Sequence, residues 1–71
     1  MFNIQYEAVD GTHKMQDFDS PSHIQLASHL ARFTRPIMAV YKNGNVITKQ
    51  ARKELRNWPG TKTRYAREFM Q

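Results

Sequence analysis

The sequence contains no cysteine, so disulfides cannot reinforce the fold and zinc sites built on cysteine thiolates are excluded. It also has no long apolar run. Its longest uncharged stretches contain serine, histidine, glutamine and threonine, whereas a membrane-spanning helix needs about 20 mostly apolar residues. The opening residues, MFNIQYEAVDG, hold neither a basic leader nor an apolar segment. We therefore expect no signal peptide, no membrane partner and a cytoplasmic location.

Glycine and recognisable motifs are scarce as well. The three glycines are scattered, two in expected hairpin turns and one after a proline, which excludes a glycine-rich phosphate loop. Zinc-finger spacing and the aromatic core of RNA-recognition motifs are also missing from the sequence. The 71 residues predict a single small domain, residues 1–71. A chain of this length buries only about 60% of its unfolded surface, so we expect a thin core.

Acidic residues are few and unevenly placed. The chain has 11 basic and 6 acidic residues, a formal net charge of +5. Residues 1–34 contain two basic and four acidic residues, a net charge of −2, whereas residues 35–71 contain nine basic and two acidic residues, a net charge of +7. Net charge of any kind keeps a small protein soluble, but this one-sided distribution favours an anionic partner.

The N-terminal third of the chain is typical of a β-hairpin. Apolar residues alternate with polar ones, the period of a half-buried strand, at Phe2, Ile4, Tyr6 and Ala8. Asp10-Gly11 favours a tight turn, so a second strand with poorer alternation is expected from about Thr12 to Phe18. The acidic residues should then lie near one another, at one end of the hairpin or on its polar face: Glu7, Asp10, Asp17 and Asp19.

The main core helix is expected after Asp19-Ser20-Pro21-Ser22. Serine or aspartate can cap its first amides, Pro21 suits the first turn, and Ser22 and Gln25 have capping-box spacing. Apolar positions cover about half of the helical wheel, at Ile24, Leu26, Ala27, Leu30, Ala31 and Phe33. His29 falls on the polar side and should face solvent, and the helix should end before Pro36.

A second hairpin and a second helix follow. Residues 37–42 suit a buried strand, Asn43-Gly44 is the strongest turn signal in the chain, and residues 45–47 return as a short strand. Thr48 is expected to cap a helix through residue 57, which Trp58-Pro59-Gly60 ends.

The C-terminal residues 61–71 leave two alternatives. Tyr65 with Phe69, and Ala66 with Met70, are four residues apart and would let a short third helix dock an apolar edge, but terminal segments also remain mobile. The fold class predicted is α+β: a small antiparallel sheet of three to four strands packed on one main helix. The expected order is β-β-α-β-β-α, with or without the C-terminal helix.

Basic residues of the second helix recur at helical spacing. At one hundred degrees per residue Lys49, Arg52, Lys53 and Arg56 fall within roughly 100°, opposite Ala51, Leu55 and Trp58. A solvated helix face is the simpler reading, but such faces usually mix charge signs, and this one repels itself. Together with nearby cations it forms our predicted nucleic-acid-binding surface: Lys42, Lys49, Arg52, Lys53, Arg56, Lys62, Arg64 and Arg67. Tyr65, Phe69 and Trp58 suit a core edge better than a base-stacking platform.

We expect no catalytic residue, metal ligand or cofactor. His13 with Asp10 and Asp17 suggests a metal or acid–base site, yet an ordinary polar hairpin explains the three residues more simply. Ser20 and Ser22 suit caps, and Ser28 has no base placed beside it. So short a chain has little room for the enclosed pocket that most enzymes need. The chain should therefore be a binding protein and not an enzyme.

Two functions fit this pattern. The first is binding of DNA or RNA through the basic helix face and C-terminal tail. The alternative is a protein–protein adaptor or inhibitor that binds an acidic surface of a larger partner, which the acidic hairpin fits slightly better because it would repel DNA. A homodimer formed through an edge strand is compatible with both. In size, charge and lack of familiar motifs the chain resembles the small accessory proteins of bacteriophages and prophages, a resemblance that implies either function.

Overall fold

Strands and helices follow one another in the order β-β-α-β-β-α-α in the computed structural model, which describes residues 1–20 and 22–71. The strands are β1 (Phe2–Glu7), β2 (His13–Phe18), β3 (Ile37–Lys42) and β4 (Asn45–Val46). The helices are α1 (His23–Ala31), α2 (Thr48–Arg56) and α3 (Arg64–Phe69). The α+β class and the predicted element order are thus confirmed, and α3 decides between the two alternatives for the C-terminal segment.

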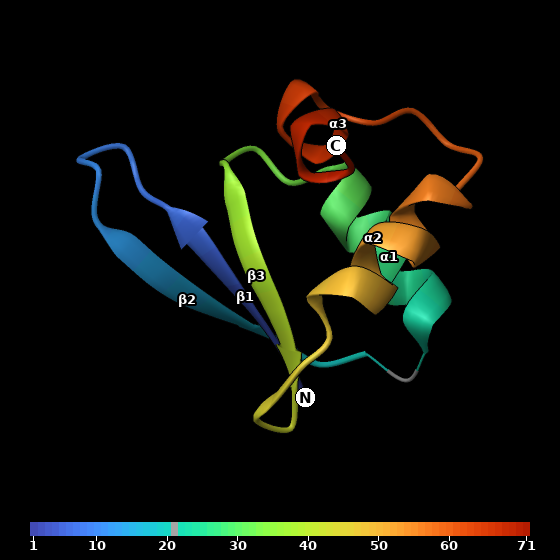
Figure 1. Ribbon diagram of the computed structural model, residues 1–71, viewed down its shortest axis with the longest axis horizontal. Helices are drawn as coiled ribbons and strands as arrows, with labels where there is room; N and C mark the ends of the chain where they lie inside the picture. The colour runs from blue at the N-terminus through green and yellow to red at the C-terminus, as the bar shows by residue number, and fades with distance from the viewer. Residues whose placement is uncertain (21) are drawn as a thin grey trace.

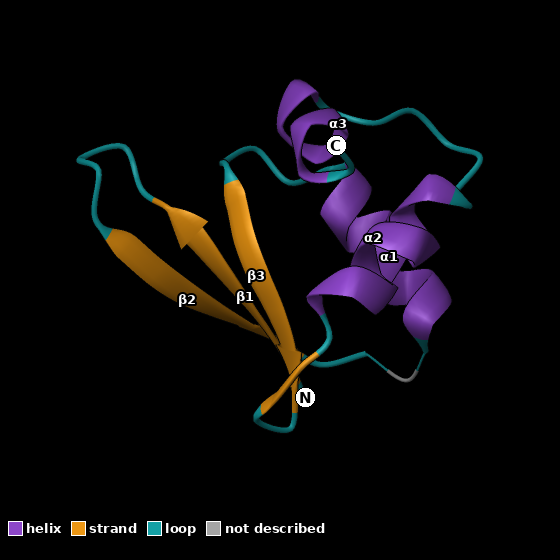
Figure 2. Ribbon diagram, viewed as in Figure 1, coloured by secondary structure: helices purple, strands orange, loops and turns teal. Residues whose placement is uncertain are grey.

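The sheet is antiparallel throughout, with the strand order β2-β1-β3-β4. The three helices gather on one face of it, and the tip of the β1–β2 hairpin extends away from them (Figure 1, Figure 2). Buried residues of β1 and β3, such as Ile4 and Val40, mark the helix-facing side. The opposite side, which we call the open face, carries Asn3, Gln5, Met15, Ala39 and Tyr41 by strand alternation and register.

The Asn43-Gly44 turn has the tight conformation predicted for it, whereas the first hairpin has a three-residue loop, residues 9–11, in which only Gly11 has a positive φ. Asn43 and Gly44 have φ values of 50° and 84°, as a two-residue turn of type I′ requires. In the first hairpin, Gly11 has a φ of 85°, and the Ala8 N–H donates to Thr12 O at 2.8 Å. Thr12 donates to Asp10 Oδ1 through its backbone N–H and its hydroxyl, at 3.0 and 2.6 Å, and these bonds lower the pKa of the Asp10 carboxyl.

The core lies between the sheet and the helices. Its largest fully buried side chains come from β1, α1, α2 and β3, namely Ile4, Leu26, Leu30, Leu55 and Val40. Phe2, Phe33 and Phe69 complete the same cluster. Trp58 packs half-buried against it, which confirms the expected core-edge position. The buried sides of β1 and α2 are therefore the apolar sides that their periodicity predicts.

Helix α1 begins and ends close to the predicted positions, with errors at two positions of its wheel, Ile24 and His29. Ser22 is the N-cap, and its hydroxyl accepts from the Gln25 N–H at 3.3 Å; the expected role of Pro21 lies outside the described residues. Ile24, predicted to be buried, is 67% exposed. It lies on the same side of the helix as Ala31, but α3 packs only near the C-terminal end, where the Thr63 N–H donates to Ala31 O at 2.9 Å.

The start of α2 also differs from the prediction. Ile47 occupies the N-cap position and Thr48 is the first helical residue, so Thr48 does not cap the helix. Its hydroxyl accepts instead from the Val40 N–H of β3 at 3.2 Å. The side chain thus ties α2 to the sheet, a role that the sequence could not distinguish from capping because both require a hydroxyl beside the helix start.

Helix α3 is fixed to the domain through its own cap. The Thr63 hydroxyl accepts from the Ala66 N–H at 3.2 Å and donates to Phe33 O at 2.6 Å. Ala66 and Phe69 are buried, at 0% and 4% exposed. No helix formed by residues 1–20 and 22–71 is long and apolar enough to cross a membrane.

Candidate nucleic-acid interface

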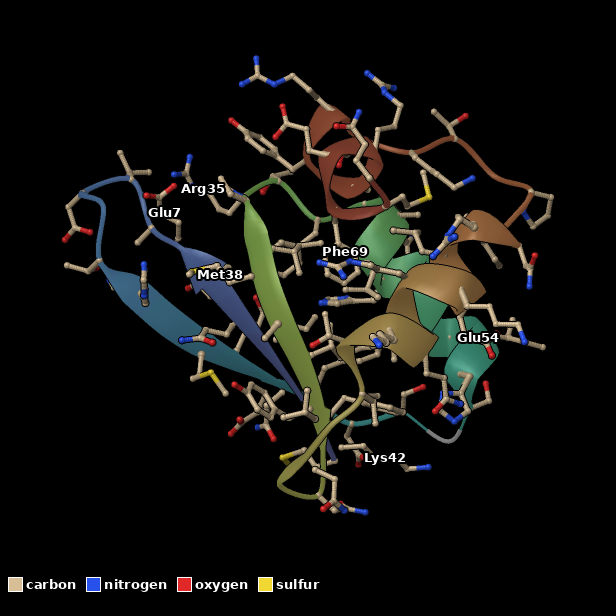
Figure 3. The ribbon with its side chains drawn as sticks, in the orientation of Figure 1. Glu7, Arg35, Met38, Lys42, Glu54 and Phe69 are labelled. Carbon is tan, nitrogen blue, oxygen red and sulfur yellow. The ribbon has the colours of Figure 1, made fainter. Side chains whose placement is uncertain are left out.

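Helix α2 has the two-sided character that its sequence predicts. Ala51 and Leu55 are fully buried, whereas Lys49, Lys53 and Arg56 are exposed. We call these three exposed cations the basic face of α2. Glu54, the acidic residue of this helix, lies on the opposite side of α2 from Phe69 (Figure 3). The basic face therefore presents like charges one turn apart, without an acidic residue between them.

Arg52 has a different environment from the other three cations of α2. It is half-buried, and its Nε–H donates to Phe69 O at 2.9 Å. Its guanidinium carbon lies 5.2 Å from the centroid of the Phe69 ring, a cation–π geometry. Arg52 therefore links α2 to α3, and only the rest of its guanidinium remains for an external ligand.

The other predicted cations are spread around this helix. Lys42 lies over the Phe2 ring at 5.6 Å, and the Lys62 ammonium donates to Trp58 O at 2.6 Å. Arg67 Nη1 donates to Lys62 O at 3.0 Å, and Arg64 pairs with Glu68 at 3.4 Å. Lys42 and α3 lie at opposite ends of β3 (Figure 1, Figure 3). Four of the eight predicted residues thus belong to α2, and the other four do not form one compact cluster with them.

Ion pairs neutralise little of this charge. Within residues 1–20 and 22–71, the Arg64–Glu68 pair is the salt bridge found, and none involves the basic face of α2. Arg56 Nε–H only makes a 3.4 Å contact with Arg52 O, one turn earlier in the helix. The cations at positions 49, 53 and 56 therefore keep their charge available for a ligand.

Three acidic residues lie on the β1–β2 hairpin, and Glu7 and Asp17 share its open face, one of the two predicted placements, but they are not close together. Glu7 is paired with His13 near the turn, whereas Asp17 is paired with Asn3 at the other end of the same strands. Asp10 lies in the turn itself. Figure 3 shows Glu7 on the far side of β3 from the helices. The acidic residues of the hairpin thus lie apart from the basic face of α2, although Lys14 and Arg35 lie near them.

His29 is the clearest histidine error, since it was expected to face solvent. Its ring is half-buried and stacks on Phe18 with 4.1 Å between centroids, and Phe33 packs against it edge-on at 5.8 Å. Burial, and then the charge of Arg32, lower the pKa of His29 from its ordinary value of 6.5. A helical wheel of α1 cannot show that Phe18 of β2 returns over this position.

This pKa predicts a pH dependence of stability. The folded pKa of His29 lies below the unfolded value, so its contribution to the free energy of unfolding is complete above 6.5 and is lost as the pH falls through the folded pKa. Urea unfolding should therefore give a lower free energy of unfolding at acidic pH, and His29→Phe, which retains a stacked ring, should reduce the slope. An NMR titration of the His29 ring with a midpoint at or above 6.5 would contradict this.

The serine and histidine side chains near the start of α1 make structural contacts. Among the described residues, no group of three or more histidine and acidic side chains could hold a metal ion. Ser20 and Ser22 bond to each other and to the start of α1, as caps do. His23 packs edge-on against Phe2 at 5.8 Å, at the half-buried boundary that its position in the first turn suggests.

Sequence reasoning missed the surface around the β1–β2 hairpin. Two adjoining cavities of about 430 and 300 Å³ both border Tyr6 and Arg35, whose Nε–H donates to Glu7 O at 2.9 Å. Every residue of β2 except Phe18 is exposed, including Met15 at 52%. The poor alternation of residues 12–18 was the available signal, because a strand exposed on both faces has no apolar side to repeat.

Comparisons of the chain with protein-family models, with curated proteins and with solved structures find no match.

Proposed function

We propose that this protein binds nucleic acid by its phosphate backbone, with Lys49, Lys53 and Arg56 as the principal contacts. The observation that carries the proposal is the exposure of these three cations without an acidic partner in the described chain. Lys49 and Lys53 lie four residues apart on a helix, a like-charge spacing that costs about 0.2–0.5 kcal/mol in isolation. A bound row of phosphates would relieve this repulsion, and water alone relieves it less.

Arg52 supports the same surface indirectly. Its hydrogen bond to Phe69 O holds the end of α3 against α2, and Arg67 of α3 in turn donates to Lys62 O. Phosphate contacts of this kind position a protein on nucleic acid and carry no sequence information by themselves. We therefore propose binding with little sequence preference.

The aromatic residues favour duplex over single-stranded nucleic acid. Single-strand binding proteins stack bases on exposed aromatic rings. Phe69 is only 4% exposed, and Trp58 packs half-buried against the core. Tyr65 is half-buried as well, with the Arg64 and Arg35 guanidinium carbons at 5.2 and 5.8 Å from its ring centroid. In the described chain, the cations of the basic face are thus more exposed than these three aromatic rings, which would have to stack on bases.

A salt titration of the wild-type protein tests the proposal. For three phosphate contacts, the logarithm of the association constant for duplex DNA should fall by about 2.7 per log unit of salt. Affinity should then drop roughly 40-fold between about 50 and 200 mM salt. Fluorescence anisotropy with matched duplex and single-stranded oligonucleotides measures both slopes. Affinity independent of salt would overturn the proposal, and tighter single-strand binding would overturn the duplex preference.

The second candidate, an adaptor or inhibitor for an acidic protein surface, has one observation in its favour. Met15, Met38 and Val46 are 52%, 40% and 69% exposed, and Met38 lies on the side of β3 away from Phe69 (Figure 3). Exposed methionines suit adaptable protein contacts. Affinity capture with and without nuclease separates the two functions, because a nucleic-acid-bridged complex disappears after digestion and a direct protein complex persists.

A further inference from the structure

We propose that two copies of this chain pair antiparallel along the outer edge of β2, with Met15 facing Met15 of the second copy across a two-fold axis. The proposal does not involve the basic face of α2 and stands independently of the proposed function. It assigns a partner, a strand and a register to the exposed hairpin.

Strand β2 is the outer strand of the sheet, and its residues from His13 to Asp17 are all exposed. An exposed edge strand offers unpaired backbone groups to another chain, and proteins usually protect such edges with charged side chains, proline, a bulge or a covering helix. Of these devices β2 has charged side chains, at Lys14 and Asp17, and a second copy must accommodate both. The β1–β2 register runs regularly from Phe2–Phe18 to Glu7–His13, without the bulge that interrupts β1–β3. The edge is therefore free of bulges and exposed along five residues.

The hydrogen-bond pattern of the β1–β2 ladder determines which residues of β2 direct their backbone N–H and C=O groups toward the free edge. The Ala8 N–H donates to Thr12 O, so the backbone groups of Ala8 and Thr12 point toward each other, in phase with the bonded pairs of the β1–β2 ladder. Bonded pairs alternate along an antiparallel ladder, which makes Tyr6–Lys14 and Ile4–Gln16 bonded pairs as well. The remaining residues of β2 direct their backbone groups away from β1, at His13, Met15 and Asp17.

Only one antiparallel register pairs His13, Met15 and Asp17 of one copy with the same three residues of the second copy. It places Met15 opposite Met15 of the second copy and His13 opposite Asp17 of the second copy, twice by symmetry. Each of these pairs would exchange two backbone hydrogen bonds. A shift of two residues would lose one of the three pairs and set Met15 against His13 or Asp17.

The side chains in this register are complementary. An imidazole faces a carboxylate on the open face at both ends, and two half-exposed methionines cover each other at the centre. On the opposite face, Lys14 faces Gln16 of the second copy, so like charges are not placed directly opposite. The isologous contact extends the sheet across both copies and removes the exposed edge.

Cysteine cross-linking tests the register directly, because the natural chain has no cysteine. Residues of a bonded antiparallel pair have Cα atoms about 5.5 Å apart, within the range of a disulfide. Met15→Cys should form a disulfide-linked dimer under oxidised glutathione at least about tenfold faster than the control Val46→Cys. Val46 is 69% exposed and lies on β4, at the other edge of the sheet.

Exchanging the charges at positions 13 and 17 tests the two His13–Asp17 pairs at the ends of the interface. Sedimentation equilibrium should show wild-type dimers, weaker association for His13→Asp, and restored association for His13→Asp combined with Asp17→Lys, with circular dichroism to verify folding. A wild-type protein that stays monomeric up to millimolar concentration would overturn the proposal, and the exposed edge of β2 would then be free to bind a different partner. Equal cross-linking rates for the two cysteine variants, or an unchanged association of His13→Asp, would also overturn it.

Discussion

Replacing Leu30 with alanine should remove a large part of the stability of this protein. Leu30 is fully buried in the cluster that joins α1 to the sheet. A leucine-to-alanine change at such a site costs about 2–5 kcal/mol, because the transfer energy of the lost atoms adds to the cost of the cavity. A domain of this size has a free energy of unfolding of about 3.5–11 kcal/mol in total. Urea unfolding followed by circular dichroism measures the loss.

The same helix provides a matched control. Ile24 is 67% exposed, so Ile24→Ala should change the free energy of unfolding by less than about 0.5 kcal/mol. The two substitutions remove aliphatic side chains of equal size and differ in burial. A loss at Leu30 of less than about 1 kcal/mol, or equal losses at both positions, would show that α1 is not packed as described.

Ile24 also shows where sequence reasoning about this fold stops. Local signals identified the strand alternation of β1, the Asn43-Gly44 turn and the Ser22 cap, because each depends on neighbours a few residues away. The burial of Ile24 depends on how far α3 extends along α1, which is a relation between segments some forty residues apart. A helical wheel has no information about the length of the element that covers it.

The same limit of sequence reasoning applies to the candidate site. Periodicity placed Lys49, Lys53 and Arg56 on one exposed helix side, because the opposite side had to be apolar. It could not separate Arg52 from them, since the bond to Phe69 O requires α3 to dock beside α2. Arg52 is consequently a poor choice for testing ligand binding, because its replacement would also loosen α3. Lys53 and Arg56 are the better pair.

Reversing Lys53 and Arg56 together should nearly abolish binding to duplex DNA at low salt. Loss of two phosphate contacts should reduce the salt slope by about 1.8 and weaken affinity roughly 200-fold at about 50 mM salt. Both side chains are exposed, so Lys53→Glu with Arg56→Glu should leave the core intact. The cost from acidic residues in the last turn of α2 should be about 0.3–1 kcal/mol for each. Fluorescence anisotropy measures affinity, and circular dichroism reports folding.

A second double reversal separates position from net charge. Lys14→Glu with Arg32→Glu also replaces two exposed cations, one on β2 and one at the end of α1, and lowers the formal net charge from +5 to +1, as the first pair does. If the basic face of α2 makes the contacts, this variant should keep most of the affinity and the salt slope of the wild type. Equal losses for both variants would mean that only total charge attracts the nucleic acid, and α2 would have no special part in binding.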